Sequence, residues 1–172
     1  MNRFAAWLAQ TSVSLTIQNH EWVIPTIQSV HIVAIGVVLG SVFMIALRIL
    51  GWAGGDQTLQ QTTARFGPWL SWALLLLAVT GAVMIVGEPA RELLAFSFWV
   101  KMALVAAGTI AALLFKRALH RREGQSEAAF ASGPRLKAMA VVTLLIWAGA
   151  VVFGRLIAYD HIWGSWSKAL KG

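Results

Sequence analysis

The sequence predicts an all-α integral membrane protein, an up-down bundle of four transmembrane helices preceded by an amphipathic segment. Hydrophobic residues make up 58% of the 172 residues and charged residues only 12%, whereas an ordinary soluble domain is about a quarter charged. Four apolar stretches are each long enough to cross a bilayer, which takes about 20 helical residues. None of them alternates polar with apolar residues as the strands of a membrane β-barrel do.

The same composition excludes several classes of protein. So apolar a chain is neither disordered nor a typical soluble enzyme. Because cysteine is absent, disulfides, Cys-zinc sites, iron–sulfur clusters and covalently attached c-type haem are excluded. We therefore expect one transmembrane domain over residues 1–172.

The first expected element is an interfacial segment over residues 1–20. Phe4, Trp7, Leu8 and Leu15 recur at helical spacing, which is typical of an amphipathic helix on a membrane surface. Polar residues from position 10 to 14 argue against a signal peptide. The four spans are expected at residues 22–50, 66–87, 93–115 and 138–159, with most of the nine tryptophans near their ends, as in an aromatic belt.

The charges of the connecting segments predict the orientation. The segment after the third span is basic, with Lys116, Arg117, Arg121, Arg122, Arg135 and Lys137. The segment between the second and third spans carries only Arg91 as a basic residue. Because positive residues favour the cytoplasmic side, we expect a bacterial inner-membrane protein with both termini in the periplasm. This topology explains the net charge of +7, and nucleic acid is not an expected partner.

Three basic side chains are expected at one depth inside the membrane. Measured from the cytoplasmic ends of their helices, His31, Lys101 and Arg155 lie about 25, 22 and 27 Å along the axis. Charged groups at such depths are costly and indicate a functional site. The helical phases of Lys101 and Arg155 place them on faces with small and polar residues, which favours a shared pocket open to the outside, with Glu88 at its rim. The alternatives are that Lys101 and Arg155 snorkel to headgroups and that His31 is a packed histidine.

One candidate ligand of this pocket is a b-type haem. Such a haem is held by two axial ligands at one level, and His31 with Met102 or Met84 would provide a His/Met pair. Lys101 and Arg155 would then suit the haem propionates.

A quinone or a lipid headgroup is the second candidate, and a metal ion is the third. The carbonyls of a quinone need hydrogen-bond donors as they are reduced, and His31, Lys101 and Glu88 would provide donors and proton exchange. A copper or other metal ion would use His31, His161 and His20, although no tight ligand spacing such as HxxxH occurs.

Two further patterns have structural interpretations. Gly36 and Gly40 form a GxxxG motif, which allows close helix contact within the bundle or with another subunit. Glu88 and Glu92 lie four residues apart across a turn and are expected to cap helix ends and to meet Arg91 or Arg155. No hydrolase constellation is visible, so an enzyme is not the expected class.

Three strings of the sequence carry a family resemblance: HIVAIGVVLGSVFMIALRILG at residues 31–51, FSFWVKM at 96–102 and GRLIAYD at 154–160. They resemble small bacterial four-helix membrane proteins of unknown function and, more remotely, copper-resistance D membrane proteins and b-type di-haem cytochromes. The resemblance implies that His31, Arg48, Lys101 and Arg155 are recurring polar positions. Many members look to carry an acid two residues before the arginine, where this chain has Ala46, which puts any proton or ion role of that position in doubt.

The leading functional expectation is an auxiliary, non-catalytic subunit of an electron-transfer assembly, whose outer pocket holds a haem or a quinone. A purely structural subunit of a larger respiratory or photosynthetic complex is the second expectation. A copper or small-solute transporter is the third. The expected partners are the lipid bilayer and other membrane-protein subunits.

Overall fold

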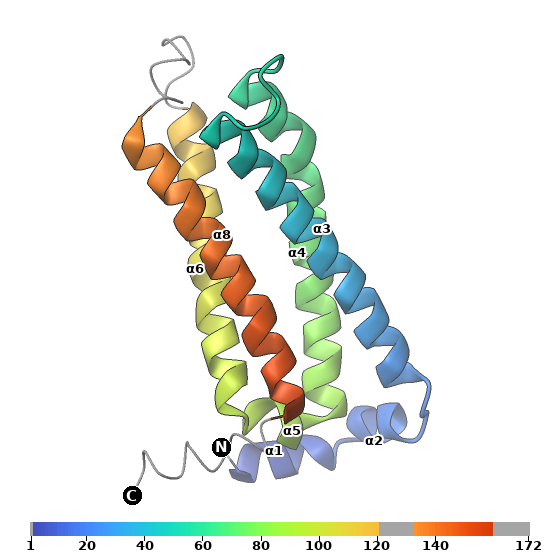
Figure 1. Cartoon of the computed structure of the whole chain (residues 1–172). Helices are drawn as coiled ribbons and strands as arrows, with labels where there is room; N and C mark the ends of the chain where they lie inside the picture. The colour runs from blue at the N-terminus through green and yellow to red at the C-terminus, as the bar shows by residue number, and fades with distance from the viewer. Residues whose placement is uncertain (1, 121–132, 160–172) are drawn as a thin grey trace, which may run out of the picture.

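The computed structural model, which describes residues 2–120 and 133–159, is an all-α bundle (Figure 1). Four of its helices are long and apolar enough to cross a membrane, which confirms the predicted fold class. The long helices are α3 (Val23–Leu50), α4 (Leu59–Gly87), α6 (Phe96–His120) and α8 (Pro134–Leu156). The shorter ones are α1 (Asn2–Ala9), α2 (Ser12–Gln18), α5 (Pro89–Leu93) and the 3₁₀ turn η1 (Ile157–Tyr159).

Several helices extend beyond the spans expected from hydropathy. Helix α4 begins at Leu59, because Thr58 and Gln61 form a capping box in which each side chain accepts from the other residue's backbone N–H. Helix α8 begins at Pro134, whose fixed φ suits the first helical position. Caps thus extend these helices past the apolar stretches that hydropathy detects.

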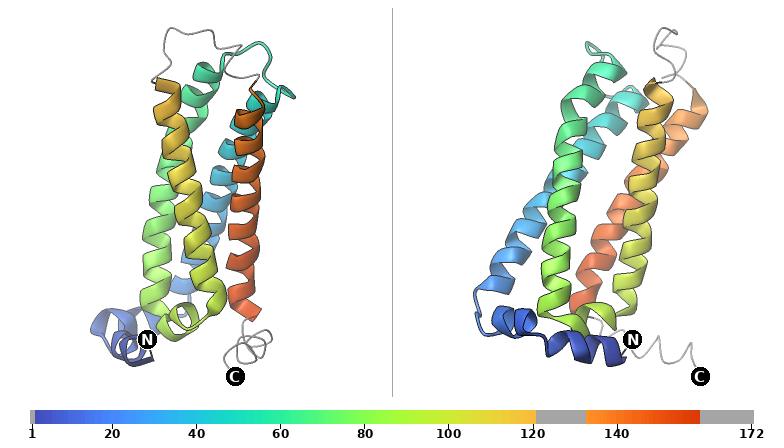
Figure 2. Two further views of the ribbon diagram at one scale, coloured as in Figure 1. Left: turned by 90° about the vertical axis from the view of Figure 1, so that its left-hand side faces the viewer. Right: turned by 180° about the vertical axis from the view of Figure 1, so that it is seen from behind.

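The four long helices do not pack equally on one another. Helix α3 packs against both α4 and α8, and α6 packs against α8. Among the described residues, α4 and α6 make few close contacts along their lengths. Contact between α4 and α6 is therefore looser than that between α3 and α4 or between α6 and α8. Figure 2 shows the four long helices from two further sides.

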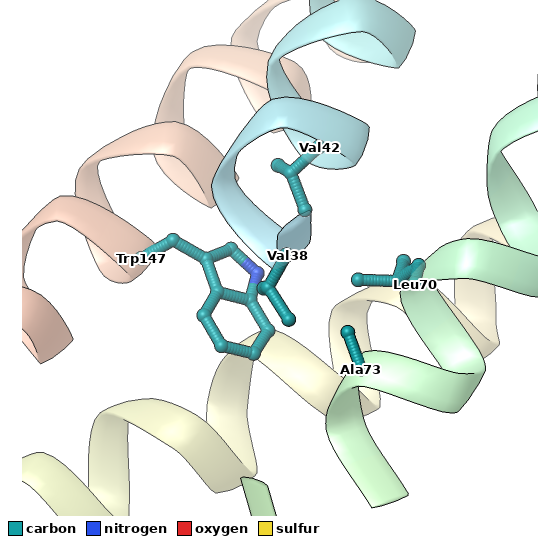
Figure 3. Packing of buried hydrophobic residues seen from close by; sticks show 5 residues of the cluster. All are labelled: Val38, Val42, Leu70, Ala73 and Trp147. Carbon is teal, nitrogen blue, oxygen red and sulfur yellow. The ribbon is translucent and has the colours of Figure 1, made fainter. Parts of the chain in front are cut away.

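The core in the middle of the bundle centres on Trp147 of α8. Its indole is only 3% exposed and clusters with Val38 and Val42 of α3 and with Leu70 and Ala73 of α4 (Figure 3). The indole also lies against α6, where Gly108 has no side chain to obstruct it. The indole Nε1 has no hydrogen-bond partner among the described residues, so tight apolar packing holds this ring in place.

The N-terminal segment forms two helices that lie across one end of the bundle, as Figure 1 shows. Helix α1 packs on α5, and α2 packs on the end of α4. The buried Ser14 hydroxyl donates to the Val86 carbonyl at 2.7 Å, and the Gln18 amide donates to the Gly87 carbonyl at 3.1 Å. Because the last carbonyls of a helix lack partners within it, α2 caps α4. We call this end of the molecule the α5 end and the opposite end the loop end.

Large apolar side chains cover much of the outer surface of the long helices. Exposed examples include Ile32, Val33, Trp69, Trp72, Val79, Ile110 and Leu145. A surface of this kind is unfavourable in water and matches a lipid bilayer. The protein is accordingly a multi-pass membrane protein.

The contact between Gly108 and Trp147 yields the first prediction. A Cβ added at Gly108 would lie 2.8 Å from Trp147 Cε2, so Gly108→Ala should lower stability by about 1–3 kcal/mol through overpacking. Thermal unfolding in detergent measures this loss. The matched control is Gly36→Ala, where nothing lies within 4 Å and the change should be neutral or stabilising because alanine favours helix. Two results would contradict the packing described. One is equal stability of Gly108→Ala and Gly36→Ala, and the other is failure of a second substitution, Trp147→Leu, to restore stability to Gly108→Ala.

Candidate functional site

His31 is held in the bundle interior, near the α5 end, by a hydrogen bond between helices. It is 8% exposed, and its Nδ1 lies 2.7 Å from the hydroxyl of Thr80 on α4. That hydroxyl donates its own proton to the Leu76 carbonyl at 2.7 Å, so it accepts from Nδ1–H of the imidazole. In the neutral ring the lone pair therefore resides on Nε2. Gly81 leaves space beside the ring, since a Cβ there would lie 3.8 Å from His31 Cε1.

Lys101 enters the same region from α6. Its stem runs along α8 at Gly154, where an added Cβ would lie 3.5 Å from the lysine Cδ and 3.8 Å from Nζ. The glycine thus leaves room for the lysine stem between α6 and α8. The ammonium is close enough to act electrostatically on His31 and on Glu92.

Glu92 of the short helix α5 provides the acidic member of this group. The residue is 6% exposed, and burial raises the pKa of its carboxyl above its ordinary value of 4.5. The positive charges of Lys101 and Arg91 partly oppose this shift, and Glu88 adds to it. We call His31, Thr80, Lys101 and Glu92 the polar cluster, which four different helices contribute.

The other residues expected in this pocket lie elsewhere. Arg155 is exposed, and its guanidinium bonds to the Tyr159 hydroxyl at 3.2 Å and lies over that ring. Glu88 forms an ion pair with Arg91 near the surface, one of the alternatives expected for it. Met102 is exposed on α6. The expected convergence of three basic groups is therefore found for His31 and Lys101 and not for Arg155.

The expected metal ligands do not form a cluster in the described part of the chain. His20 is exposed, and its Nδ1 lies 2.8 Å from the Thr16 carbonyl. His161 lies outside the described residues. No group of three His, Asp or Glu side chains that could hold a metal ion occurs within residues 2–120 and 133–159.

Two of the residues expected around a haem lie away from His31. Thr80 engages only Nδ1 of His31 and leaves Nε2 free for an axial bond, but Met102, one of the two expected axial partners, lies on the exposed surface. Arg155, expected at a propionate, interacts with Tyr159 instead. Met84, the other expected axial partner, is buried on the face of α4 that carries Thr80. A haem bound there would have Lys101 for one propionate and would lack Arg155 for the other.

Gly36 and Gly40 face outward from α3. No atom lies within 4 Å of a Cβ added at either position, and neither glycine is in close contact with α4, α6 or α8. Of the two contacts expected for this motif, the one within the bundle is therefore not formed.

Sequence reasoning missed two members of the polar cluster. Thr80 lies in an apolar stretch without any distinguishing pattern. Glu92 is expected from the sequence to cap a helix or to meet an arginine, and its spacing from Glu88 does not distinguish the two acids. Glu88 caps the end of α4, whereas Glu92 lies on α5 and is buried where α1 packs on that helix.

The comparisons with known proteins identify a family and nothing more specific. Residues 6–160 match the model described as Family of unknown function (DUF6644). No curated protein and no solved structure matches the chain. The expected relation to a family of unknown function is confirmed, whereas the remote similarity to copper-resistance D proteins and cytochromes stays a prediction.

The raised pKa of Glu92 predicts how stability depends on pH. A carboxyl whose pKa is higher in the folded state favours folding while it is protonated, and this contribution is lost as pH rises through the folded pKa. The thermal midpoint in detergent should therefore fall as pH increases above 4.5, the ordinary value. Glu92→Gln keeps the neutral shape and should reduce this fall, while Glu88→Gln, at the exposed pair, should not. Identical pH profiles for the wild type and Glu92→Gln would show that Glu92 is not buried as described.

Proposed function

The chain belongs to the DUF6644 family of unknown function, and we propose that it is a non-catalytic membrane subunit of an electron-transfer assembly that binds the headgroup of a quinone. The observation that carries the proposal is the polar cluster, in which four helices bring a basic, an acidic and an imidazole side chain within electrostatic range of one another. Elsewhere the bundle interior is largely apolar. Ionisable side chains inside a membrane lower stability, so a cluster of them indicates a functional site.

The chemistry of the cluster suits a quinone in two respects. The Lys101 ammonium is a donor for a ring carbonyl, whose need for hydrogen bonds grows as electrons arrive, and the Nε2 lone pair of His31 is an acceptor for the hydroxyl of the reduced ring. Burial raises the pKa of the Glu92 carboxyl, which therefore keeps its proton to higher pH than an ordinary carboxyl does. Because the cluster lies toward one end of the helices, the apolar tail of the quinone would extend along the bundle into the lipid.

We further propose that the protein lies in a bacterial inner membrane with the α5 end on the periplasmic side. The support is the charge asymmetry of the sequence, since basic residues concentrate at the loop end. In this orientation a bound quinone would exchange protons with the periplasm. The α1 and α2 helices would then lie at the outer interface.

A purely structural role within a larger membrane complex is the second candidate. It is favoured by Gly36 and Gly40, which face outward and leave the α3 backbone open to close approach. Under this proposal α3 packs on a helix of another subunit, and the polar cluster stabilises the bundle.

Quinone binding tests the leading proposal. We expect the purified protein in detergent to bind decylubiquinone, measured as ligand retained after equilibrium dialysis. Loss of one hydrogen bond in His31→Ala should weaken binding by up to about tenfold. His20→Ala is the matched control, because this exposed histidine lies near the same end, and it should bind as the wild type does.

Three results would contradict the leading proposal. The first is absence of binding by the wild type, and the second is equal loss in both histidine variants. The third is a Soret band that changes with dithionite, which would restore the haem hypothesis. If His31→Ala disrupts only co-purification of other membrane subunits, the structural role is favoured instead.

Single-cysteine labelling tests the orientation, because the chain has no cysteine of its own. Glu21→Cys lies at the α5 end and Asp56→Cys at the loop end, and both positions are exposed. A membrane-impermeant maleimide added to intact spheroplasts should label only Glu21→Cys. Labelling of Asp56→Cys alone would reverse the proposed orientation.

A further inference from the structure

A second candidate binding site lies toward the loop end, far from the polar cluster. It is a cavity of about 420 Å³ between α4 and α6, with a floor formed by α3 and α8. This volume is within the range of about 300–1,000 Å³ that ligand pockets usually have. Because α4 and α6 make few close contacts, and lining residues such as Ser71 and Leu113 are exposed, the cavity opens sideways between them.

The inner part of the cavity is apolar in its chemistry. The hydroxyl groups that line the cavity already have hydrogen-bond acceptors, because each donates to the backbone carbonyl four residues earlier in its own helix. These groups are Thr63, Ser71, Thr109 and Thr143. The remaining deep walls are aliphatic, including Val42, Leu70 and Leu74. A hydrocarbon chain fits this part, and a polar solute does not.

The rim of the cavity nearest the loop end carries one basic side chain among apolar ones such as Phe115 and Leu119. Lys116 of α6 lines it, at the end of the bundle where the basic residues gather. The described basic residues at this end are Arg48, Arg65, Lys116, Arg117, Arg135 and Lys137, and the described acidic residue there is Asp56. From Lys116 to Thr109 the cavity extends about 10 Å along α6. The cavity thus has one cationic end and one apolar end, spaced as in an amphiphile.

The geometry points to an anionic phospholipid as the occupant, with one acyl chain between α4 and α6 and its phosphate at Lys116. Charge complementarity selects the anionic headgroup, since basic pockets between transmembrane helices are known to suit such lipids. The apolar walls select the acyl chain. In a bilayer, lipid is also the molecule present at the sideways opening, and an empty space there would forfeit packing contacts.

Native mass spectrometry of the detergent-solubilised protein tests this inference. The protein is titrated with phosphatidylglycerol and, separately, with phosphatidylcholine of the same acyl chains. We expect preferential retention of phosphatidylglycerol. Lys116→Gln should reduce that preference by about fivefold, the value of one basic residue near an anionic lipid. The matched control is Arg117→Gln, the same loss of charge on the adjacent residue, which does not line the cavity and should keep the preference.

A second pair of variants tests the acyl-chain site. Gly67 lines the cavity, and no atom lies within 4 Å of a Cβ added there. Gly67→Leu should therefore fill the space and lower retention of both lipids without loss of fold. Gly36→Leu, with the same freedom on the outer face of α3, should retain both lipids as the wild type does.

Specific results would overturn the inference. These are equal retention of the two phospholipids by the wild type, identical effects of Lys116→Gln and Arg117→Gln, or unchanged retention in Gly67→Leu. The inference would also fail if decylubiquinone displaced phosphatidylglycerol and Lys116→Gln had no effect on that displacement. This result would assign the cavity to an uncharged ligand.

Discussion

The structure depends on how an apolar bundle accommodates the ammonium group of Lys101. A lysine within a membrane helix needs either a route to water or compensating charge. In this chain Glu92, buried on the short helix α5, acts electrostatically on the lysine and offsets part of the cost of burying it, and Gly154 gives the lysine stem a path along α8. The connection between α4 and α6 is thus not merely a turn. It delivers the acid that the interior requires, and α1 covers it from outside.

This constraint divides the molecule into three levels. The α5 end is polar inside and closed by α1, α2 and α5. In the middle, the indole of Trp147 fits against Gly108 and forms an apolar layer with Val38 and Ala73. Toward the loop end the helices leave a sideways cavity with Lys116 at its margin. The apolar layer separates the two candidate sites, so we expect their ligands to bind independently of each other.

The sequence predicted the fold because long apolar stretches are strong signals. It also placed His31 and Lys101 at a similar depth, because depth along a helix follows from counting residues. It placed Arg155 inside as well, yet the arginine pairs with Tyr159 one turn later, a local contact that depth does not reveal. Glu92, Thr80 and the cavity escaped prediction for a different reason. Their burial depends on how closely helices approach, and hydropathy carries no information about the space between α4 and α6.

The central claim is that Lys101 and Glu92 interact inside the bundle, and a double-mutant cycle measures this most directly. The free energy of unfolding in one detergent at neutral pH is determined for the wild type, Lys101→Met, Glu92→Gln and the double variant. If the two side chains interact, we expect a coupling of about 0.5–3 kcal/mol, with the double variant more stable than the sum of the single effects requires. Strict additivity of the two substitutions would show that they do not interact.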